Sequence, residues 1–452
     1  MRYIFFVLIF LLFSSRAFAL EVVYPKKTLV NINSETTFFI GNTSPKDFLT
    51  INGHHVMVHP SGGFAHFVKL RPGQNNFLIK TETEEKNFVI NRTKKASGNW
   101  GCKTFMKYPS LKYLKTAYDN VPLRDTPVDD GINRLAHYQK GVLLTADGEQ
   151  NGFYRIVLNE NTFGYIRKEN TIATERTEPA KINSYKKIKD KEFDIFEFDI
   201  DKKAPFSLHE GDSLTLKIYN VKDNDNSTFT FSVPVEKILF GYSGRYEDGK
   251  FILKIRKFPK IEKSQPLKDI TITIDAGHGG KELGAIGCLG DCEKDINLKI
   301  AKFLQEELLK RGANVIMTRE DDSNPSLRQR VEISNNANSM IFLSLHNNAL
   351  PDSQDPLTRR GSSTYYYYNQ SKALADVLLD FLNADLCTGN DGVHQRSFAV
   401  VRNTESLAVL IEFAYMINPF DNANLVNDDF QKSCAFVIAN ALEYYFLTNS
   451  KK

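Results

Sequence analysis

The sequence predicts a multidomain protein in which three all-β modules precede one α/β domain. At 452 residues the chain is too long for a single hydrophobic core, so several domains are expected. Up to about residue 257, short alternating runs of apolar and polar residues are separated by turn residues, which is typical of β structure. After residue 267, apolar strand-like runs alternate with helix-length segments, as they do in α/β domains.

Residues 1–19 have the features of a secretion signal. A basic start at Arg2 precedes an apolar run from Ile4 to Phe13, and Ala17 and Ala19 supply the small residues of a cleavage site. The alternative is an uncleaved membrane anchor, although the apolar run is short for a membrane helix. No later stretch of sequence approaches that length. We therefore expect a secreted protein with no membrane span once the signal is removed. The periplasm and the outer face of the cell wall are both open as locations, and the periplasm is the one we expect.

The composition also limits the classes of partner. Hydrophobic residues make up 42% of the chain and charged residues 25%, which are ordinary values for a globular protein. The formal net charge of +4 is small for this length. It argues against nucleic acid as a partner and is compatible with a position near an anionic wall polymer.

The first β module is predicted over residues 20–95. Strand-like runs such as Thr36–Ile40 and Phe64–Val68 are separated by hairpin signals, including Asn52-Gly53. Several short strands at this spacing predict a small β-sandwich. The segment "INGHHVMVHPSGGFAHFVKLRPGQNNFLIK" resembles bacterial immunoglobulin-like modules.

Two further β modules are predicted over residues 108–172 and 180–260. The first contains Leu123-Arg124-Asp125-Thr126-Pro127, a Lys140-Gly141 turn and a final Gly164-Tyr165-Ile166, and it resembles a bacterial SH3-like barrel. This resemblance implies that wall peptides or other proteins bind to it. The second shows strand alternation and no visible chemistry, and a charged segment with two prolines then forms a linker up to Pro266.

The last domain is predicted over residues 268–449, with a sheet of about six strands. Helices are expected over 293–310, 371–385 and 428–446, the first because apolar residues recur every four positions from Ile296 to Leu308. The expected strands are 271–275, 314–318, 340–345, 363–368, 398–401 and 408–412.

Three candidate metal ligands stand next to the ends of these elements. His278 lies in a glycine-rich turn after the first strand, Glu293 begins the long helix, and His346 follows the strand 340–345. Functional groups in α/β folds collect at such ends. Two histidines and one carboxylate also form the donor set of a catalytic zinc site, because they leave a fourth position for water.

A fourth residue, Glu412, is the candidate general base. It ends an apolar run that begins at Ala408, and a carboxylate in such a place is costly unless it is paired or employed. The alternative is a salt-bridged glutamate at a strand end. Asp275 either orients a zinc ligand or caps the glycine turn, while Arg319 and Arg330 are expected to support the domain rather than contact substrate.

These residues occur within blocks that resemble the N-acetylmuramoyl-L-alanine amidase family of zinc enzymes. The blocks are "TIDAGHGGKELGAIG", "EKDINLKIAKFLQEELLKRGANVIMTRED", "LRQRVEISNNANSMIFLSLHNNA" and "AVLIEFAYMINPFDNANLV". The resemblance implies that His278, Glu293 and His346 bind Zn²⁺ and that Glu412 is catalytic. It implies cleavage of peptidoglycan between N-acetylmuramic acid and the L-alanine of the stem peptide, for wall remodelling or daughter-cell separation.

Two alternatives remain open for this domain. A zinc peptidase would cut within the stem peptide with the same metal chemistry, and an adaptor would use an inactive amidase domain for binding. The presence of all four residues argues against the adaptor, whereas only the reaction products separate the amidase from the peptidase.

The sequence contains five cysteines, Cys102, Cys288, Cys292, Cys387 and Cys434. Cys288 and Cys292 lie just before Glu293 and are expected to form a small disulfide or to remain two free thiols. Their ligation to zinc is less favoured, because two more ligands would close the position needed by water.

Overall fold

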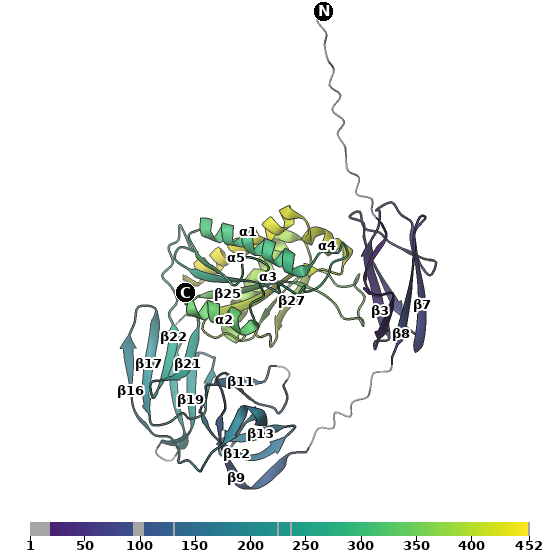
Figure 1. The fold of residues 1–452 in the computed structure, drawn as a ribbon. Helices are drawn as coiled ribbons and strands as arrows, with labels where there is room; N and C mark the ends of the chain where they lie inside the picture. Colours follow the sequence, from purple (N-terminus) through teal and green to yellow (C-terminus); the bar gives the residue numbers. More distant parts are fainter. Residues whose placement is uncertain (1–18, 94–103, 130–131, 224–225, 236, 451–452) are drawn as a thin grey trace, which may run out of the picture.

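The computed structural model describes residues 19–93, 104–129, 132–223, 226–235 and 237–450 (Figure 1). In Figure 1 the α/β domain lies between the N-terminal β region on one side and two further β regions on the other. Apart from Ala19, the predicted signal segment lies outside the described residues, as does Cys102. No helix within the described ranges combines the length and apolar character needed to cross a membrane.

The N-terminal region consists of two sheets with a common hydrophobic core. The three-stranded sheet has the order β1 (Glu21–Tyr24), β3 (Thr36–Asn42), β6 (Gly63–Lys69). The five-stranded sheet has the order β2 (Leu29–Ile32), β8 (Glu85–Arg92), β7 (Gly73–Lys80), β4 (Leu49–Ile51), β5 (His54–Val56). Phe39 of β3 packs on Phe77 of β7 with ring centroids 5.1 Å apart, in agreement with the predicted β-sandwich.

The second β region is one antiparallel sheet of seven strands. Its order is β11 (Arg134–Tyr138), β10 (Val121–Arg124), β14 (Thr162–Arg167), β13 (Phe153–Asn159), β12 (Leu143–Gln150), β9 (Met106–Thr116), β15 (Thr171–Ala173), with a short 3-10 helix at Lys168–Asn170. The region is therefore all-β as predicted. Its likeness to SH3 barrels stays a prediction.

The third β region has two sheets and shares its core with the second. The sheets are β16 (Ile182–Lys189), β17 (Phe193–Ile200), β22 (Lys250–Arg256), β21 (Tyr242–Glu247), and β18 (Phe206–His209), β19 (Ser213–Asp223), β20 (Asn226–Pro234). Buried residues of both regions form one apolar cluster, and the Tyr138 hydroxyl donates to the Phe206 carbonyl over 3.0 Å. The two predicted modules thus pack as a unit.

The α/β domain is built on a mixed sheet of six strands. The order is β24 (Asn314–Met317), β23 (Thr271–Ala276), β25 (Ile341–Asn348), β28 (Leu407–Tyr415), β26 (Ser362–Tyr366), β27 (Asn390–Gln395). The first four strands are parallel, so their carboxyl ends meet at one edge, and β26 runs antiparallel to β28. This edge carries the candidate site.

Five α-helices surround this sheet. They are α1 (Glu293–Lys310), α2 (Leu327–Asn336), α3 (Lys372–Leu386), α4 (Pro419–Leu425) and α5 (Asp428–Ser450), with a 3-10 helix at Asn369–Ser371. Apolar residues of α1, α3 and α5 form one large core with the sheet, and α2 lies on the opposite side of the sheet in Figure 1. The predicted helix 293–310 is confirmed because its apolar face is buried in this core.

One predicted strand is wrong. Residues 399–401 form a turn, and the sixth strand is β27 instead. Val400 and Val401 are buried beside Phe342 on one face of the sheet, so their apolar character reflects burial of a turn rather than strand pairing. β27 (NDGVHQ) is an edge strand with one aliphatic side chain and therefore gives almost no strand signal.

Candidate active site

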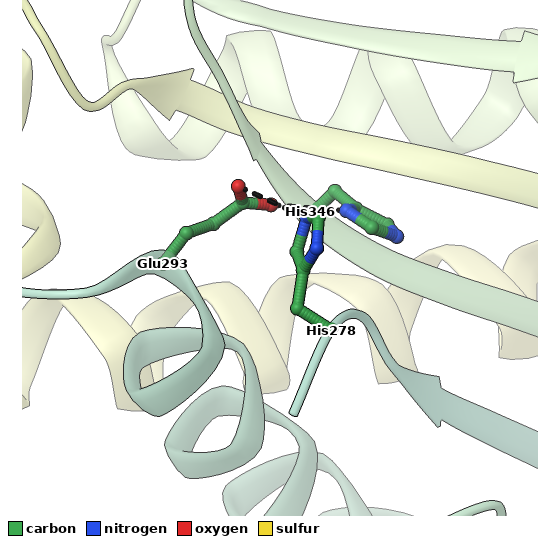
Figure 2. Close-up of side chains that lie close together, drawn as sticks. All are labelled: His278, Glu293 and His346. Atoms are coloured by element: carbon green, nitrogen blue, oxygen red, sulfur yellow. Dashed lines mark hydrogen bonds and ion pairs between the residues drawn. The ribbon is translucent and has the colours of Figure 1, made fainter. Parts of the chain in front are cut away.

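The three predicted metal ligands meet at the carboxyl edge of the sheet. His278 lies in the turn after β23, Glu293 is the first residue of α1, and His346 lies near the end of β25 (Figure 2). One ligand atom from each side chain lies within 4.8 Å of the other two. Two imidazole nitrogens and a carboxylate oxygen in this arrangement fit a divalent transition metal such as zinc.

Glu293 lies between the two histidines. Its Oε2 is 3.1 Å from His278 Nε2, and its Oε1 is 2.9 Å from His346 Nδ1. The glutamate side chain is 5% exposed, whereas those of His278 and His346 are 31% and 18% exposed. Burial alone raises the pKa of the Glu293 carboxyl, but the hydrogen bonds and charges of the two histidines outweigh burial, so this pKa lies below its usual range. The carboxylate is therefore ionised and ready to bind a cation.

Backbone and amide groups fix the orientation of Glu293. The backbone N–H groups of Ala285 and Asn347 donate to its two carboxylate oxygens over 2.8 and 3.1 Å. Asn297, one turn further along α1, donates to Oε1 over 3.2 Å and accepts a hydrogen bond from Asn347 Nδ2. We did not identify Asn297 or Asn347 from the sequence. Two features of the sequence could have indicated them. Asn297 lies four residues after Glu293, on the same helix face, and Asn347 directly follows His346.

The turn that carries His278 is held by two buried arginines. Arg330 donates to the carbonyls of Ala276 and His278, each over 2.8 Å, and Arg319 donates to the carbonyls of Ala276 and Gly277. Asp275 accepts from Arg330 over 2.7 Å, and also from Thr318 and Ser344. Through these bonds Asp275 contacts none of the three predicted metal-binding side chains. It supports the site through Arg330.

Glu412 lies beside His346 across two parallel strands. The register of β25 and β28 pairs His346 with Glu412, so their side chains project from the same face of the sheet. The Oε2 atom is buried and has no hydrogen-bond partner among the described residues, although the residue as a whole is partly exposed. Burial and the charge of Glu293 raise the pKa of Glu412 well above its usual value. No ion pair of Glu412 is found within the described ranges, so the salt-bridged alternative gains no support.

The cysteines before Glu293 do not contribute to this cluster. Cys288, Cys292, Cys387 and Cys434, the cysteines within the described ranges, are all free. Cys288 is buried, and its Sγ lies 3.3 Å from the Ile417 carbonyl oxygen. A disulfide or two free thiols were predicted for Cys288 and Cys292, and the structure has two free thiols.

The α/β domain matches a known family. Residues 272–444 fit the sequence profile of a family described as N-acetylmuramoyl-L-alanine amidase. The C-terminal domain of this chain is an amidase domain of that family. A curated relative, "Probable cell wall amidase LytH" of Staphylococcus aureus, is 36% identical over 187 residues, which cover 41% of this chain and 61% of the relative. The chain thus spans about three fifths of that relative's length.

Solved structures of amidases are also similar to part of this chain. The catalytic domain of CwlV, an N-acetylmuramoyl-L-alanine amidase from Bacillus (Paenibacillus) polymyxa var. colistinus, is 33% identical, with 39% of this chain and 97% of that chain covered and a TM-score of 0.37. AmiC2 of Nostoc punctiforme is 31% identical, with coverage of 42% and 99% and a TM-score of 0.38.

Gly277 provides a test of the amidase site geometry. A Cβ atom at this position would lie 2.2 Å from His346 Cε1 and 2.3 Å from its Nε2, so Gly277→Ala must displace the imidazole. We expect zinc affinity, measured by competition with a fluorescent chelator, to fall about 10- to 100-fold, the usual effect of disturbing the support of a ligand. Gly211→Ala is the control, since its Cβ would meet only the Ser213 carbonyl oxygen at 3.8 Å. Unchanged affinity in Gly277→Ala would show that His346 does not bind the metal in this position.

Proposed function

We propose that this protein is a zinc-dependent N-acetylmuramoyl-L-alanine amidase that hydrolyses the amide bond between N-acetylmuramic acid and the L-alanine of the stem peptide in peptidoglycan. The observation that carries the proposal is the position of Glu412 beside the His278–Glu293–His346 cluster, within a domain that matches the amidase family. The intact set of four residues favours an active enzyme over an adaptor.

The side chains divide the chemistry between them. His278, Glu293 and His346 would hold Zn²⁺, which lowers the pKa of a bound water and polarises a carbonyl group. Glu412 takes a proton from the attacking water and returns it to the amine of the departing L-alanine, as general acid–base catalysis of amide hydrolysis requires. The unpartnered Oε2 of Glu412 supports this role, because no neighbouring protein group competes for it.

The remaining parts of the proposal concern location and the β regions. An enzyme of this kind acts outside the cytoplasm, and the predicted signal segment and the small net charge favour secretion to the periplasm. Residues 108–172, proposed as an SH3-like module, would bind wall peptides or another protein and so place the enzyme on its substrate.

The test is product analysis with the full mature chain on isolated peptidoglycan, with and without a zinc chelator. Free stem peptides that begin with L-alanine, detected by mass spectrometry and lost with the chelator, are the expected result. Shortened stems that remain attached to glycan would instead identify a peptidase. No release with added zinc would favour the adaptor.

A further inference from the structure

The N-terminal β-sandwich is docked against the amidase domain by a set of specific contacts. Asp352, in the loop after β25, accepts hydrogen bonds from the Tyr24 hydroxyl and the Thr37 hydroxyl, each over 2.7 Å. The Thr36 hydroxyl donates to the backbone carbonyl of Asp352 over 3.0 Å. Three donors from two neighbouring strands, β1 and β3, thus converge on one residue of the amidase domain.

An apolar cluster lies beside these hydrogen bonds. Phe38, Ile40 and Ala65 of the sandwich pack with Cys288 and Ile417 of the amidase domain, and each of the five is no more than 5% exposed. A mixed core of this kind excludes water from both partners and fixes their relative position. The sandwich is therefore a structural neighbour of the loops around the site.

A cavity of about 360 Å³ lies at this junction. Val23, Tyr24 and Lys26 line it from the sandwich. Ala285, Leu350 and Asp352 are among the residues that line it from the amidase domain. Its walls are mainly apolar, and Lys26 supplies the cationic group.

The cavity begins next to the metal site. The backbone N–H of Ala285 donates to Glu293 Oε2 over 2.8 Å, so one wall of the cavity is a single hydrogen bond from a candidate metal ligand. Residues 349–352 also line the cavity, and this segment starts three residues after His346. The cavity is therefore lined by one residue that contacts Glu293 and by a segment that follows His346 closely in the chain.

Lys26 is available to bind an anion in this cavity. Its side chain is exposed and forms no ion pair with the described residues. It lies close enough to Cys292, the residue before Glu293, to interact with that side chain electrostatically. The carboxylate of Asp352 is already occupied by hydrogen bonds from the sandwich. Lys26 is therefore the charged residue of the cavity lining that has no hydrogen-bond or ion-pair partner among the described residues.

We propose that this cavity binds the stem peptide beyond its first residue, with Lys26 paired to a carboxylate of the peptide. The inference rests on the proposed function, because the peptide is the part of a muramoyl peptide that extends past the scissile amide. Stem peptides carry free carboxylates and short aliphatic groups after the L-alanine, which match a cationic side chain beside an apolar wall. The N-terminal sandwich then forms part of the substrate site and sets the preference for substrates with longer stems.

The test compares two soluble substrates, muramoyl-L-alanine and a muramoyl tripeptide, with the full mature chain. We expect Lys26→Glu to raise the KM for the tripeptide about tenfold, a loss of about 1.4 kcal/mol, and to leave kcat/KM for muramoyl-L-alanine unchanged. Lys27→Glu is the matched control, because it reverses the same charge at the next exposed residue, which does not line the cavity. Equal effects on both substrates, or on both variants, would overturn the proposal.

Binding measurements separate this inference from the proposed function. Calorimetry with the zinc-loaded Glu412→Gln chain reports the affinity for the tripeptide without turnover, and the same tenfold loss is expected when Lys26→Glu is added. If the wild-type chain hydrolyses neither substrate but this loss appears, the amidase activity fails and the binding site stands. If both substrates are hydrolysed and Lys26→Glu leaves tripeptide affinity unchanged, the binding site alone is wrong.

Discussion

Glu412→Gln is expected to lower kcat on a muramoyl peptide about 10²- to 10⁴-fold, the usual contribution of a positioned general base. The amide keeps the shape of the side chain but cannot accept the proton of the attacking water. Glu412 is not among the three side chains whose ligand atoms cluster, so the zinc content should stay at that of the wild type. Chromatography of the products measures kcat. Atomic absorption measures the zinc content of the variant.

Stability should respond to Glu412→Gln in the opposite direction from activity. The buried Oε2 atom of Glu412 has no hydrogen-bond partner among the described residues, which is unfavourable for folding, so the substitution should leave the protection of β28 from hydrogen exchange unchanged or raise it. Glu405→Gln is the matched control, since this partly exposed glutamate precedes the same strand and lies 3.9 Å from Arg245. Activity within a few-fold of wild type in Glu412→Gln would remove this residue from the mechanism.

The three candidate metal ligands could be predicted because each stands at or near the end of a regular element, whereas Glu412 lies inside β28. His278 follows β23, Glu293 begins α1 and His346 lies at the end of β25, and parallel strands bring such ends to one edge. The register that places Glu412 next to His346 follows from the same parallel pairing. Local patterns thus indicated which residues lie close together, whereas their expected roles came from the resemblance to the amidase family.

The features that escaped prediction depend on contacts between distant parts of the chain. The hydrogen bond of Tyr24 to Asp352 joins residues 328 positions apart, and no periodicity in either segment reports it. The common core of the second and third β regions also depends on contacts between distant segments. Alternation in a strand shows which side chains are buried, but it does not show which residues they pack against. Strand β27 was missed since an edge strand with polar residues lacks the apolar pattern used to detect strands.

The sequence predicts that Arg330 supports the domain, and the structure shows which groups it holds. Its side chain and that of Asp275 are 3% and 1% exposed, and the pair is 2.7 Å apart. Besides Asp275, the guanidinium bonds four acceptors: the carbonyls of Pro325, Ala276 and His278 and the Asn324 side chain. One side chain thus ties α2 to the strand end and to the turn that presents His278.

Arg330→Met is therefore expected to cost about 3–5 kcal/mol of local stability, because it leaves Asp275 as an uncompensated buried charge. The full chain has several domains and will not unfold in one step, so hydrogen exchange of β23 and its following turn is the suitable measurement. Arg328→Met, on the same helix, should change exchange by less than about 0.5 kcal/mol, since surface positions are usually neutral. Arg328 is 71% exposed and pairs only with Glu332.

The two arginine variants also separate support of the metal site from general stability. If Arg330 holds the His278 turn, Arg330→Met should lower zinc affinity about 10- to 100-fold even well below the melting temperature. Added zinc should then recover part of the lost protection in β23, because binding to the folded state stabilises it by mass action. Faster exchange in β23 with unchanged zinc affinity would instead mean that the turn keeps its geometry without Arg330, and that the arginine serves only to neutralise Asp275.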